Sequence, residues 1–331
     1  MNWALIGAST IARQFMVKAL LAQPNGAVRW VISGTAQRAT EFATAHDIPH
    51  FGTEMAAALA DPVVDAVYVS STNDQHFAQA MAAITAGKHV LCEKPLAMSV
   101  ADATKMVDAA DRANIVFATN HHLRCSGSHQ TIRDLIQLGR IGQVLSLRIH
   151  HAVHLPAALQ GWRINSAASG GGVVADITVH DADVARFLLA EDPQTVVAQV
   201  ANSGMGHGVE VEAMWVGTMP SGAMVSSHES FTHPFAGSGL EVHGTTGSIF
   251  ASGVMTQQPV GQIELVTAQG RENIPFPAHD LYTYGVARFC AAVAGTGTPA
   301  ATGLDGVKSL AVAQAVLEAA RTGTRVTVVY S

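Results

Sequence analysis

The chain has few charged residues, few cysteines and no long apolar run. Only 13% of its 331 residues are charged and 48% are hydrophobic, whereas soluble proteins have about 25% charged residues. This composition excludes a disordered or fibrous chain, because enough apolar side chains are present to form a core. No stretch of about 20 apolar residues occurs, so we expect no membrane-spanning helix.

The scarce residue types also limit the partners and the compartment. Cys92, Cys125 and Cys290 form no Cys-x-x-Cys pair and leave one cysteine over, so we expect thiols rather than disulfides. The net charge of −6 and the lack of a basic run argue against nucleic acid as a partner. The first residues lack the basic segment of a secretory signal, and we expect a cytoplasmic protein that does not bind membranes.

Short apolar runs alternate with helical patterns over the first 120 residues. The predicted strands cover residues 3–6, 27–32, 65–70, 89–92 and 115–119. Strands that are apolar on both faces and separated by helices are typical of a parallel sheet covered on both sides. We therefore predict a doubly wound α/β domain of the Rossmann type over residues 1–122.

The pattern changes at about residue 123, because turns rather than helices now separate the strands. The predicted strands cover residues 144–150, 195–201, 214–219, 224–228 and 248–251. This succession predicts an α+β domain over residues 123–331 with an open, largely antiparallel sheet. Helices over about 172–189 and 304–321 would cover one face. The cleft between two such domains is the usual place for a ligand.

A turn rich in small residues follows the first predicted strand. Its sequence is Gly-x-Ser-x-x-Ala, where the dinucleotide fingerprint has Gly-x-Gly-x-x-Gly/Ala. A glycine permits the tight turn, a small alanine permits close packing, and hydroxyls can face a phosphate at the helix N-terminus. The alternative is a turn without a ligand. The predicted cofactor contacts here are Gly7, Ser9, Thr10, Ile11 and Ala12.

The end of the second predicted strand indicates which cofactor is preferred. NAD enzymes place an acidic residue there to bind the ribose 2′-hydroxyl. Here Ser33 and Gly34 follow the strand, no acidic residue precedes Glu41, and Arg38 can supply charge to a 2′-phosphate. NADP is therefore favoured over NAD, the alternative for Arg38 being a solvated helix residue.

Polar residues also follow the third predicted strand, where the ligand crevice of a parallel sheet lies. The predicted cofactor contacts there are Ser71, Thr72, Asn73 and His76. The same segment can begin a helix, with Thr72 or Asn73 as its N-cap. Both interpretations can hold together.

A Glu93-Lys94-Pro95 triplet ends the fourth predicted strand, and the proline fixes the direction in which Lys94 points. Together with the Gly-Ala-Ser turn and the Gly-rich segment that leads to Asp176 and His180, this triplet resembles the glucose–fructose oxidoreductase, inositol dehydrogenase and rhizopine-catabolism (Gfo/Idh/MocA) family. The resemblance covers the whole chain. It implies NADPH-dependent reduction of a sugar ketone by hydride transfer to C2.

Reduction of a ketone also needs a proton donor at the developing alkoxide. Asp176 and His180 stand at i and i+4, where a carboxylate can orient an imidazole on one helix face. The resemblance implies that His180 is the acid and that Lys94 holds the carbonyl, but which of these two gives the proton stays open. The alternative for Asp176 and His180 is an ordinary helix ion pair.

The resemblance implies five further contacts. Trp162 and Arg163 would face the nicotinamide or the sugar, although tryptophan is also common in cores. Asn120 would lie near the nicotinamide ribose, with Glu93 beside Lys94, and Tyr282 is a weaker candidate from the second domain. The predicted substrate contacts are Lys94, Arg163, Asp176 and His180.

Three alternatives stay open. The chain could be a cyclitol or aldose dehydrogenase of the same family, or a non-catalytic NADP-binding sensor, and it could be a monomer or a homo-oligomer formed through the open sheet. We expect no metal, because neighbouring histidines such as His150 and His151 point to opposite faces of a strand and no zinc motif occurs.

Overall fold

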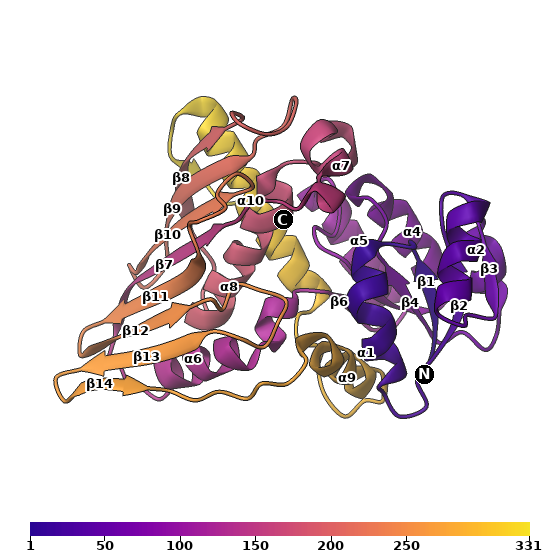
Figure 1. Cartoon of the computed structure of the whole chain (residues 1–331), viewed down its shortest axis with the longest axis horizontal. Coiled ribbons are helices and arrows are strands. Elements are labelled where there is room, and N and C mark those ends of the chain that lie inside the picture. Colours follow the sequence, from indigo (N-terminus) through magenta and orange to yellow (C-terminus); the bar gives the residue numbers. More distant parts are fainter. The chain divides into compact units, whose positions relative to one another are not determined.

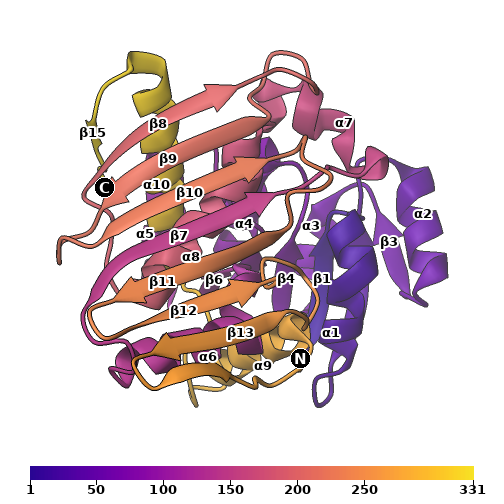
Figure 2. The same cartoon turned by 60° about the vertical axis from the view of Figure 1, so that its left-hand side comes forward.

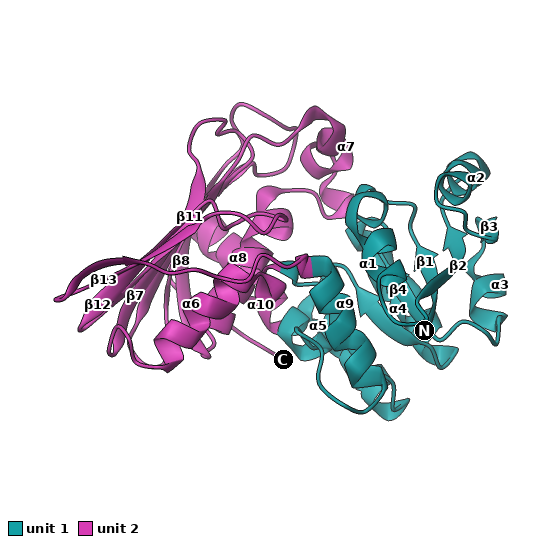
Figure 3. Ribbon diagram, turned by 60° about the horizontal axis from the view of Figure 1, so that its bottom comes forward, with its two compact units in different colours: residues 1–122, 282–307 teal, residues 123–281, 308–331 magenta.

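A computed structural model describes all 331 residues, which form two compact units (Figure 3). Unit 1 comprises Met1–His122 and Tyr282–Val307, and unit 2 comprises Leu123–Leu281 and Lys308–Ser331. The sequence-based division assigns residues 282–307 to the second domain, whereas the structure groups them with unit 1. Tyr282 therefore belongs to unit 1.

Two contacts explain why this late segment joins unit 1. The Phe289 ring packs against Trp3 with their ring centroids 5.3 Å apart. Thr302 pairs with Ala118 as an antiparallel bridge at the edge of the unit 1 sheet. The segment thus completes the apolar core of unit 1 although it is distant in sequence.

Unit 1 is built on a parallel six-stranded sheet with the order β3-β2-β1-β4-β5-β6 (Figure 1). Its strands are β1 (Asn2–Ile6), β2 (Ala27–Ile32), β3 (His50–Gly52), β4 (Ala66–Val69), β5 (His89–Cys92) and β6 (Phe117–Thr119). Every residue of β4 is buried, as expected for a strand covered on both faces. The predicted doubly wound sheet is confirmed.

Helices connect the strands of unit 1. They are α1 (Val17–Leu21), α2 (Ala36–Ala45), α3 (Met55–Ala60), α4 (Asn73–Thr85) and α5 (Val100–Arg112). A further helix, α9 (Leu281–Val293), joins this unit from late in the chain. The helical segment that follows β1 contains a π-helical stretch at Ala12–Met16 before α1.

Unit 2 is built on a nine-stranded sheet with the order β14-β13-β12-β11-β7-β10-β9-β8-β15. Its strands are β7 (Val144–Ala152), β8 (Thr195–Ala201), β9 (Glu212–Thr218), β10 (Met224–Ser230), β11 (Ser238–Gly244), β12 (Gly247–Ser252), β13 (Gln262–Thr267), β14 (Gly270–Asn273) and β15 (Val326–Thr327). Only β7 and β10 are parallel neighbours. The predicted, largely antiparallel sheet is confirmed.

One face of this sheet is covered and the other is open. Helices α6 (Gly127–Gln137), α8 (Val179–Leu189) and α10 (Gly303–Thr322) lie on the covered side (Figure 2), and α7 (Ala157–Asn165) lies beyond one end of the strands. Along β9, Trp215 is buried whereas the neighbouring Met214 is half exposed. This alternation is the period-2 pattern of a sheet with one solvated face. No helix of the structure combines the length and the apolar character that a membrane crossing requires.

Candidate active site

The carboxyl ends of neighbouring strands in unit 1 hold most of the predicted cofactor residues. The Gly7 turn follows β1, Ser33 follows β2, Ser71 follows β4, Glu93 follows β5 and Asn120 follows β6. The chain order reverses between β1 and β4, which are adjacent in the sheet. Ligands of doubly wound sheets bind at the carboxyl ends of the strands at such a switch point. The fold thus brings residues from five separate motifs to one edge of one sheet.

The turn after β1 can be formed only by glycine at its first position. Gly7 has φ of +117°, and a Cβ atom there would stand 2.7 Å from the Ser70 carbonyl carbon. The Ser9 hydroxyl donates to Ser70 Oγ at 2.8 Å and accepts from the Ala12 amide at 3.1 Å. Ser9 therefore ties the turn to the end of β4 and to the following helix, a role that the sequence pattern did not indicate.

Arg38, the predicted 2′-phosphate contact, lies in the first turn of α2. Its backbone amide donates to Thr35 Oγ1 at 3.3 Å, so Thr35 caps α2. Its guanidinium donates to the Ala8 carbonyl at 3.3 Å, so the side chain extends back over the turn after β1. Ser33 is buried at the end of β2. The guanidinium is thus held beside the turn after β1, while its helix begins just after β2.

His76 links the segment after β4 to the Glu-Lys-Pro triplet. Its Nδ1 lies 2.8 Å from the Pro95 carbonyl oxygen, and its Nε2 lies 3.2 Å from the Ser71 carbonyl oxygen. The side chain is almost fully buried, and burial lowers the pKa of His76 below its usual value. A neutral imidazole has one N–H, so it donates to one of these two carbonyl oxygens, and its ring lies between the segment after β4 and Pro95, whose peptide bond to Lys94 is cis.

Glu93 is a buried carboxylate at the end of β5. It accepts hydrogen bonds from the Tyr68 hydroxyl at 2.6 Å and from Asn120 Nδ2 at 2.5 Å. Burial raises the pKa of Glu93, while these two donors and the nearby Lys94 oppose that rise. Asn120 is thus fixed by Glu93 at the end of β6. Tyr68 is a residue that the sequence analysis missed, although a tyrosine in a fully buried strand needs a partner for its hydroxyl.

Tyr282 packs within unit 1. Its ring stacks on Phe15 with centroids 4.7 Å apart and on His122 with centroids 5.2 Å apart. Only 2% of the residue is exposed. These contacts give Tyr282 a packing role, and its contact with a cofactor stays a prediction.

In unit 2, residues from two predicted motifs meet. Arg163 Nε lies 3.5 Å from Asp176 Oδ2, and the Arg163 guanidinium lies over the Trp162 ring, 4.8 Å from its centroid. Asp176 lies in a π-helical turn, Val174–Thr178, that precedes α8. The helix predicted over residues 172–189 is therefore not a continuous α-helix, and α-helical i, i+4 geometry does not apply between Asp176 and His180. π-Helical turns often occur at functional sites.

His180 is buried in the first turn of α8, and the residue that follows it belongs to a cluster of buried acids. Asp181 Oδ1 lies 2.8 Å from His151 Nδ1. Glu229 accepts from Trp215 Nε1 at 2.9 Å and from the Ser227 hydroxyl at 2.5 Å. Burial, and then the charge of Asp181, raise the pKa of Glu229 well above its usual value. Burial beside Asp181 thus favours the protonated form of Glu229.

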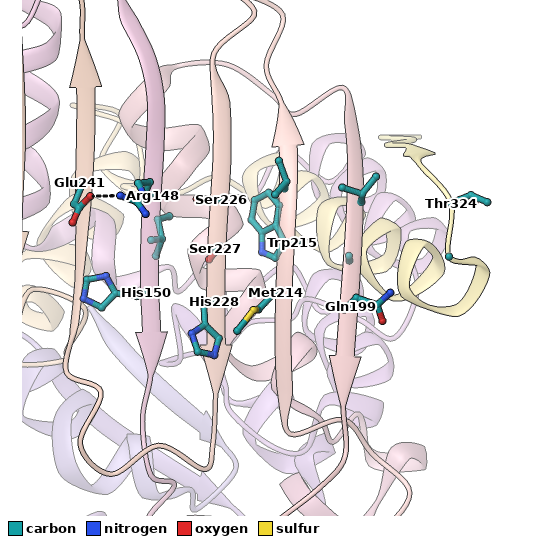
Figure 4. Close-up of a pocket in the computed structure, with 15 residues that line it drawn as sticks. Arg148, His150, Gln199, Met214, Trp215, Ser226, Ser227, His228, Glu241 and Thr324 are labelled. Atoms are coloured by element: carbon teal, nitrogen blue, oxygen red, sulfur yellow. Dashed lines mark hydrogen bonds and ion pairs between the residues drawn. The ribbon is translucent and has the colours of Figure 1, made fainter.

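This cluster of buried acids was not predicted from the sequence. A signal was present, because Glu229 occupies an inward-facing position of an alternating strand, where a charged residue is unusual. His150 and His151 point to opposite faces of β7, as predicted. His151 faces the helices, whereas His150 lines a hollow of about 650 Å³ on the open face together with Met214 and His228 (Figure 4). None of the predicted site residues lines this hollow.

Two family models match the chain. Residues 1–121 match a model described as oxidoreductase family, NAD-binding Rossmann fold. Residues 129–250 match the GFO/IDH/MocA C-terminal domain. Both expectations drawn from the resemblance, for the fold and for the family, are therefore confirmed.

Individual relatives agree with the family models. The chain is 49% identical to a 1,5-anhydro-D-fructose reductase of Ensifer adhaerens over 323 residues, which are 97% of each chain. An aldose-aldose oxidoreductase of Caulobacter crescentus, solved with glycerol, superposes with a TM-score of 0.91 at 24% identity and 99% coverage of both chains. Levoglucosan dehydrogenase, solved with NADH and levoglucosan, superposes with a TM-score of 0.88 at 22% identity and 99% coverage of both chains. The chain belongs to the GFO/IDH/MocA family of oxidoreductases.

Proposed function

We propose that this chain is an NADPH-dependent sugar-ketone reductase that converts 1,5-anhydro-D-fructose to 1,5-anhydro-D-mannitol. The observation on which the proposal depends is the 49% identity, over 97% of both chains, to the Ensifer adhaerens reductase. The residues of the predicted site support it, since the Glu93-Lys94-Pro95 triplet, Asp176 and His180 are all present. A non-catalytic sensor has no need to keep such a set.

The residues of unit 1 fit a dinucleotide. Gly7 permits the tight turn after β1, where a Cβ atom would clash with the Ser70 backbone, and this turn leads into the helix N-terminus at which a pyrophosphate would bind. Ser33 in place of an acidic residue, with the Arg38 guanidinium beside the turn, favours a cofactor that has a 2′-phosphate. When bound, NADPH would supply the hydride. Further along the sheet edge, Ser71, Thr72, Asn73, His76 and Asn120 would bind the rest of the cofactor.

Side chains of the protein would bind the substrate and supply the proton. Lys94 would donate a hydrogen bond to the substrate carbonyl and stabilise the negative charge that develops on its oxygen. His180 would donate the proton to that oxygen, with Lys94 as the competing donor. Arg163, held by Asp176, would bind the sugar hydroxyls from the Trp162 side.

Kinetics of purified variants test the catalytic roles. Lys94→Ala and His180→Ala should each lower kcat for 1,5-anhydro-D-fructose by about 10²- to 10⁴-fold, measured as NADPH oxidation at 340 nm. Lys105→Ala and His207→Ala, two exposed positions, are the matched controls and should retain the wild-type rate. Wild-type turnover in both site variants would reject the assigned roles. A parallel panel of cyclitols and aldoses with NADP⁺ and NAD⁺ tests the alternative dehydrogenase.

Variants at the end of β2 test the cofactor preference. Ser33→Asp should lower kcat/KM for NADPH relative to NADH, because a carboxylate would repel the 2′-phosphate. Arg38→Ala should raise KM for NADPH by about tenfold or more, the cost of one charge-assisted contact, and leave KM for NADH unchanged. Arg112→Ala, an exposed arginine at the end of α5, is the control. An unchanged NADPH preference in both variants would contradict this assignment.

The oligomeric state and the cellular compartment are proposed separately from the reaction. Met214, Met224 and Val197 are exposed on the open sheet face, and apolar side chains there support a homo-oligomer formed through this face over a monomer. Light scattering of the purified protein distinguishes the two. We propose a cytoplasmic enzyme, in agreement with three cysteines that are all free.

A further inference from the structure

Three potential metal ligands converge on unit 2, outside the proposed reductase site. Glu212 begins β9 and is paired with Ser230 at the end of β10, so His228 is its diagonal neighbour on the same face of the sheet. His233 lies just after β10, in a segment held by a bridge between Thr232 and His154. The fold therefore unites three residues that no sequence motif connects.

The distances between their ligand atoms suit one ion. His228 Nε2 lies 3.0 Å from Glu212 Oε1, and His233 Nε2 lies 3.8 Å from the same oxygen. One ligand atom from each of the three residues lies within 4.8 Å of the other two. Zinc bonds to nitrogen and oxygen of about 2.0–2.2 Å in a tetrahedron require ligand atoms about 3.3 Å apart. Small side-chain rotations therefore suffice to place an ion among them.

The surroundings of His233 provide an independent indication. Its Nδ1 lies 2.7 Å from Ser230 Oγ and 3.2 Å from Thr232 Oγ1. A proton on Nδ1 satisfies these oxygens and leaves the lone pair of Nε2 directed toward Glu212. Metal-binding histidines are oriented in this way, by a hydrogen bond from the ring nitrogen that does not bind the metal.

The site is also accessible. The side chains of Glu212, His228 and His233 are 26%, 27% and 38% exposed. An ion can therefore enter from solvent, and a water molecule can complete a four-coordinate shell.

We propose that Glu212, His228 and His233 bind one Zn²⁺ ion, with water as the fourth ligand. Two imidazoles and one carboxylate are a common donor set for zinc. The ion would join the segment after β10 to the sheet and stabilise that end of unit 2. The sequence predicts no metal because adjacent histidines point to opposite faces of a strand and no zinc motif occurs. Neither pattern detects ligands that only strand pairing brings together.

Titration of the full chain with Zn²⁺ tests the proposal. After removal of metal with a chelator, the protein should take up one equivalent of Zn²⁺ in competition with a chromophoric indicator. His233→Ala and Glu212→Gln should weaken binding by at least about tenfold. With Co²⁺ as the probe, wild-type protein should show the visible absorption of a tetrahedral ion, and the His228→Ala variant should lose it.

His243→Ala is the matched control. His243 Nε2 lies 3.2 Å from Glu241 Oε2 on the same sheet, so it forms a histidine–glutamate pair without the third ligand. Zn²⁺ affinity should be unchanged in this variant. The proposal is overturned if the wild-type protein takes up no stoichiometric Zn²⁺, or if binding persists in His228→Ala and His233→Ala variants whose circular dichroism is native. Because the readout is metal binding, its outcome is independent of reductase activity.

Discussion

The two units bury their charged groups in different ways. In unit 1, Glu93 is the one buried residue among the aspartates, glutamates, lysines and arginines, and its partners Tyr68 and Asn120 are neutral. In unit 2 the buried charged residues are Arg124, Asp181, Asp183, Arg186 and Glu229. Helix α8 explains the difference, because it is buried along nearly its whole length and its polar residues must find partners inside the protein.

Burial of a charged group costs free energy, and the groups beside it decide whether its charged or its neutral form is favoured. Glu93 has two neutral donors and a lysine beside it, and these groups stabilise its charged form against the effect of burial. Asp183 is paired with two arginines, Arg124 and Arg186. Glu229 is buried beside the Asp181 carboxylate, so its pKa is raised and its neutral form is favoured. Each arrangement predicts a different response to mutation.

The largest effect is expected from the ion pair of unit 2. Arg124 donates from Nε and Nη2 to the two carboxylate oxygens of Asp183, each at 2.7 Å. Arg124→Ala would leave Asp183 buried without its main partner, so we expect the free energy of unfolding to fall by about 3–5 kcal/mol. Chemical denaturation measures this fall.

The exposed pair of Arg140 and Glu272, 3.3 Å apart, is the control for that comparison. Arg140→Ala should cost about 0–1 kcal/mol, because solvent screens the pair. Equal losses in the two variants would remove the distinction between buried and exposed pairs in unit 2.

The second effect concerns the pH dependence of stability. The pKa of Glu229 is higher in the folded state than in the unfolded chain, so its favourable contribution is complete below about pH 4.3 and declines as the pH rises toward the folded pKa. In that window the free energy of unfolding should fall by about 1.4 kcal/mol per pH unit through this group.

The Glu229→Gln variant should lack this contribution, because glutamine keeps the shape and stays neutral. We expect the stability difference between the variant and the wild type to move in favour of the variant as the pH rises from 5 to 8, in urea titrations at several pH values. A difference that is constant with pH would mean that Glu229 is ionised in the folded protein.

The smallest effect is expected at the surface of unit 1. Ser99 caps α5, accepting from the Asp102 amide at 3.1 Å and donating to the Asp102 carboxylate at 2.9 Å. Ser99→Ala should lower the free energy of unfolding by about 1 kcal/mol. Ser99→Thr keeps the hydroxyl as both acceptor and donor and should retain most of that stability. A cost near that of Arg124→Ala would show that unit 1 also depends on single polar contacts.

Much of the fold followed from local patterns. Apolar runs of strand length predicted both sheets, and the small or polar residues after those runs predicted the strand ends at which Gly7, Ser33 and Glu93 lie. These features depend on neighbours in sequence. The two family domains and the order of their motifs were equally visible.

Features that depend on distant pairing were not predicted. Residues 282–307 join unit 1 through Phe289 and Thr302, whose partners lie near the start of the chain and at β6. The cluster of Glu212, His228 and His233 exists only in the observed register of β9 and β10. The π-helical turn at Asp176 changes the helix geometry that spacing alone suggested.

The parallel contact between β7 and β10 has a consequence for folding. Parallel neighbours need a long crossover connection, and here residues 153–223, which include α8 and two strands, form it. β7 and β10 can pair only after this whole segment has reached its place, and pairing of strands so distant in sequence is slow. We therefore expect the helix that bears His180 to reach its final place in the same late step that closes the sheet.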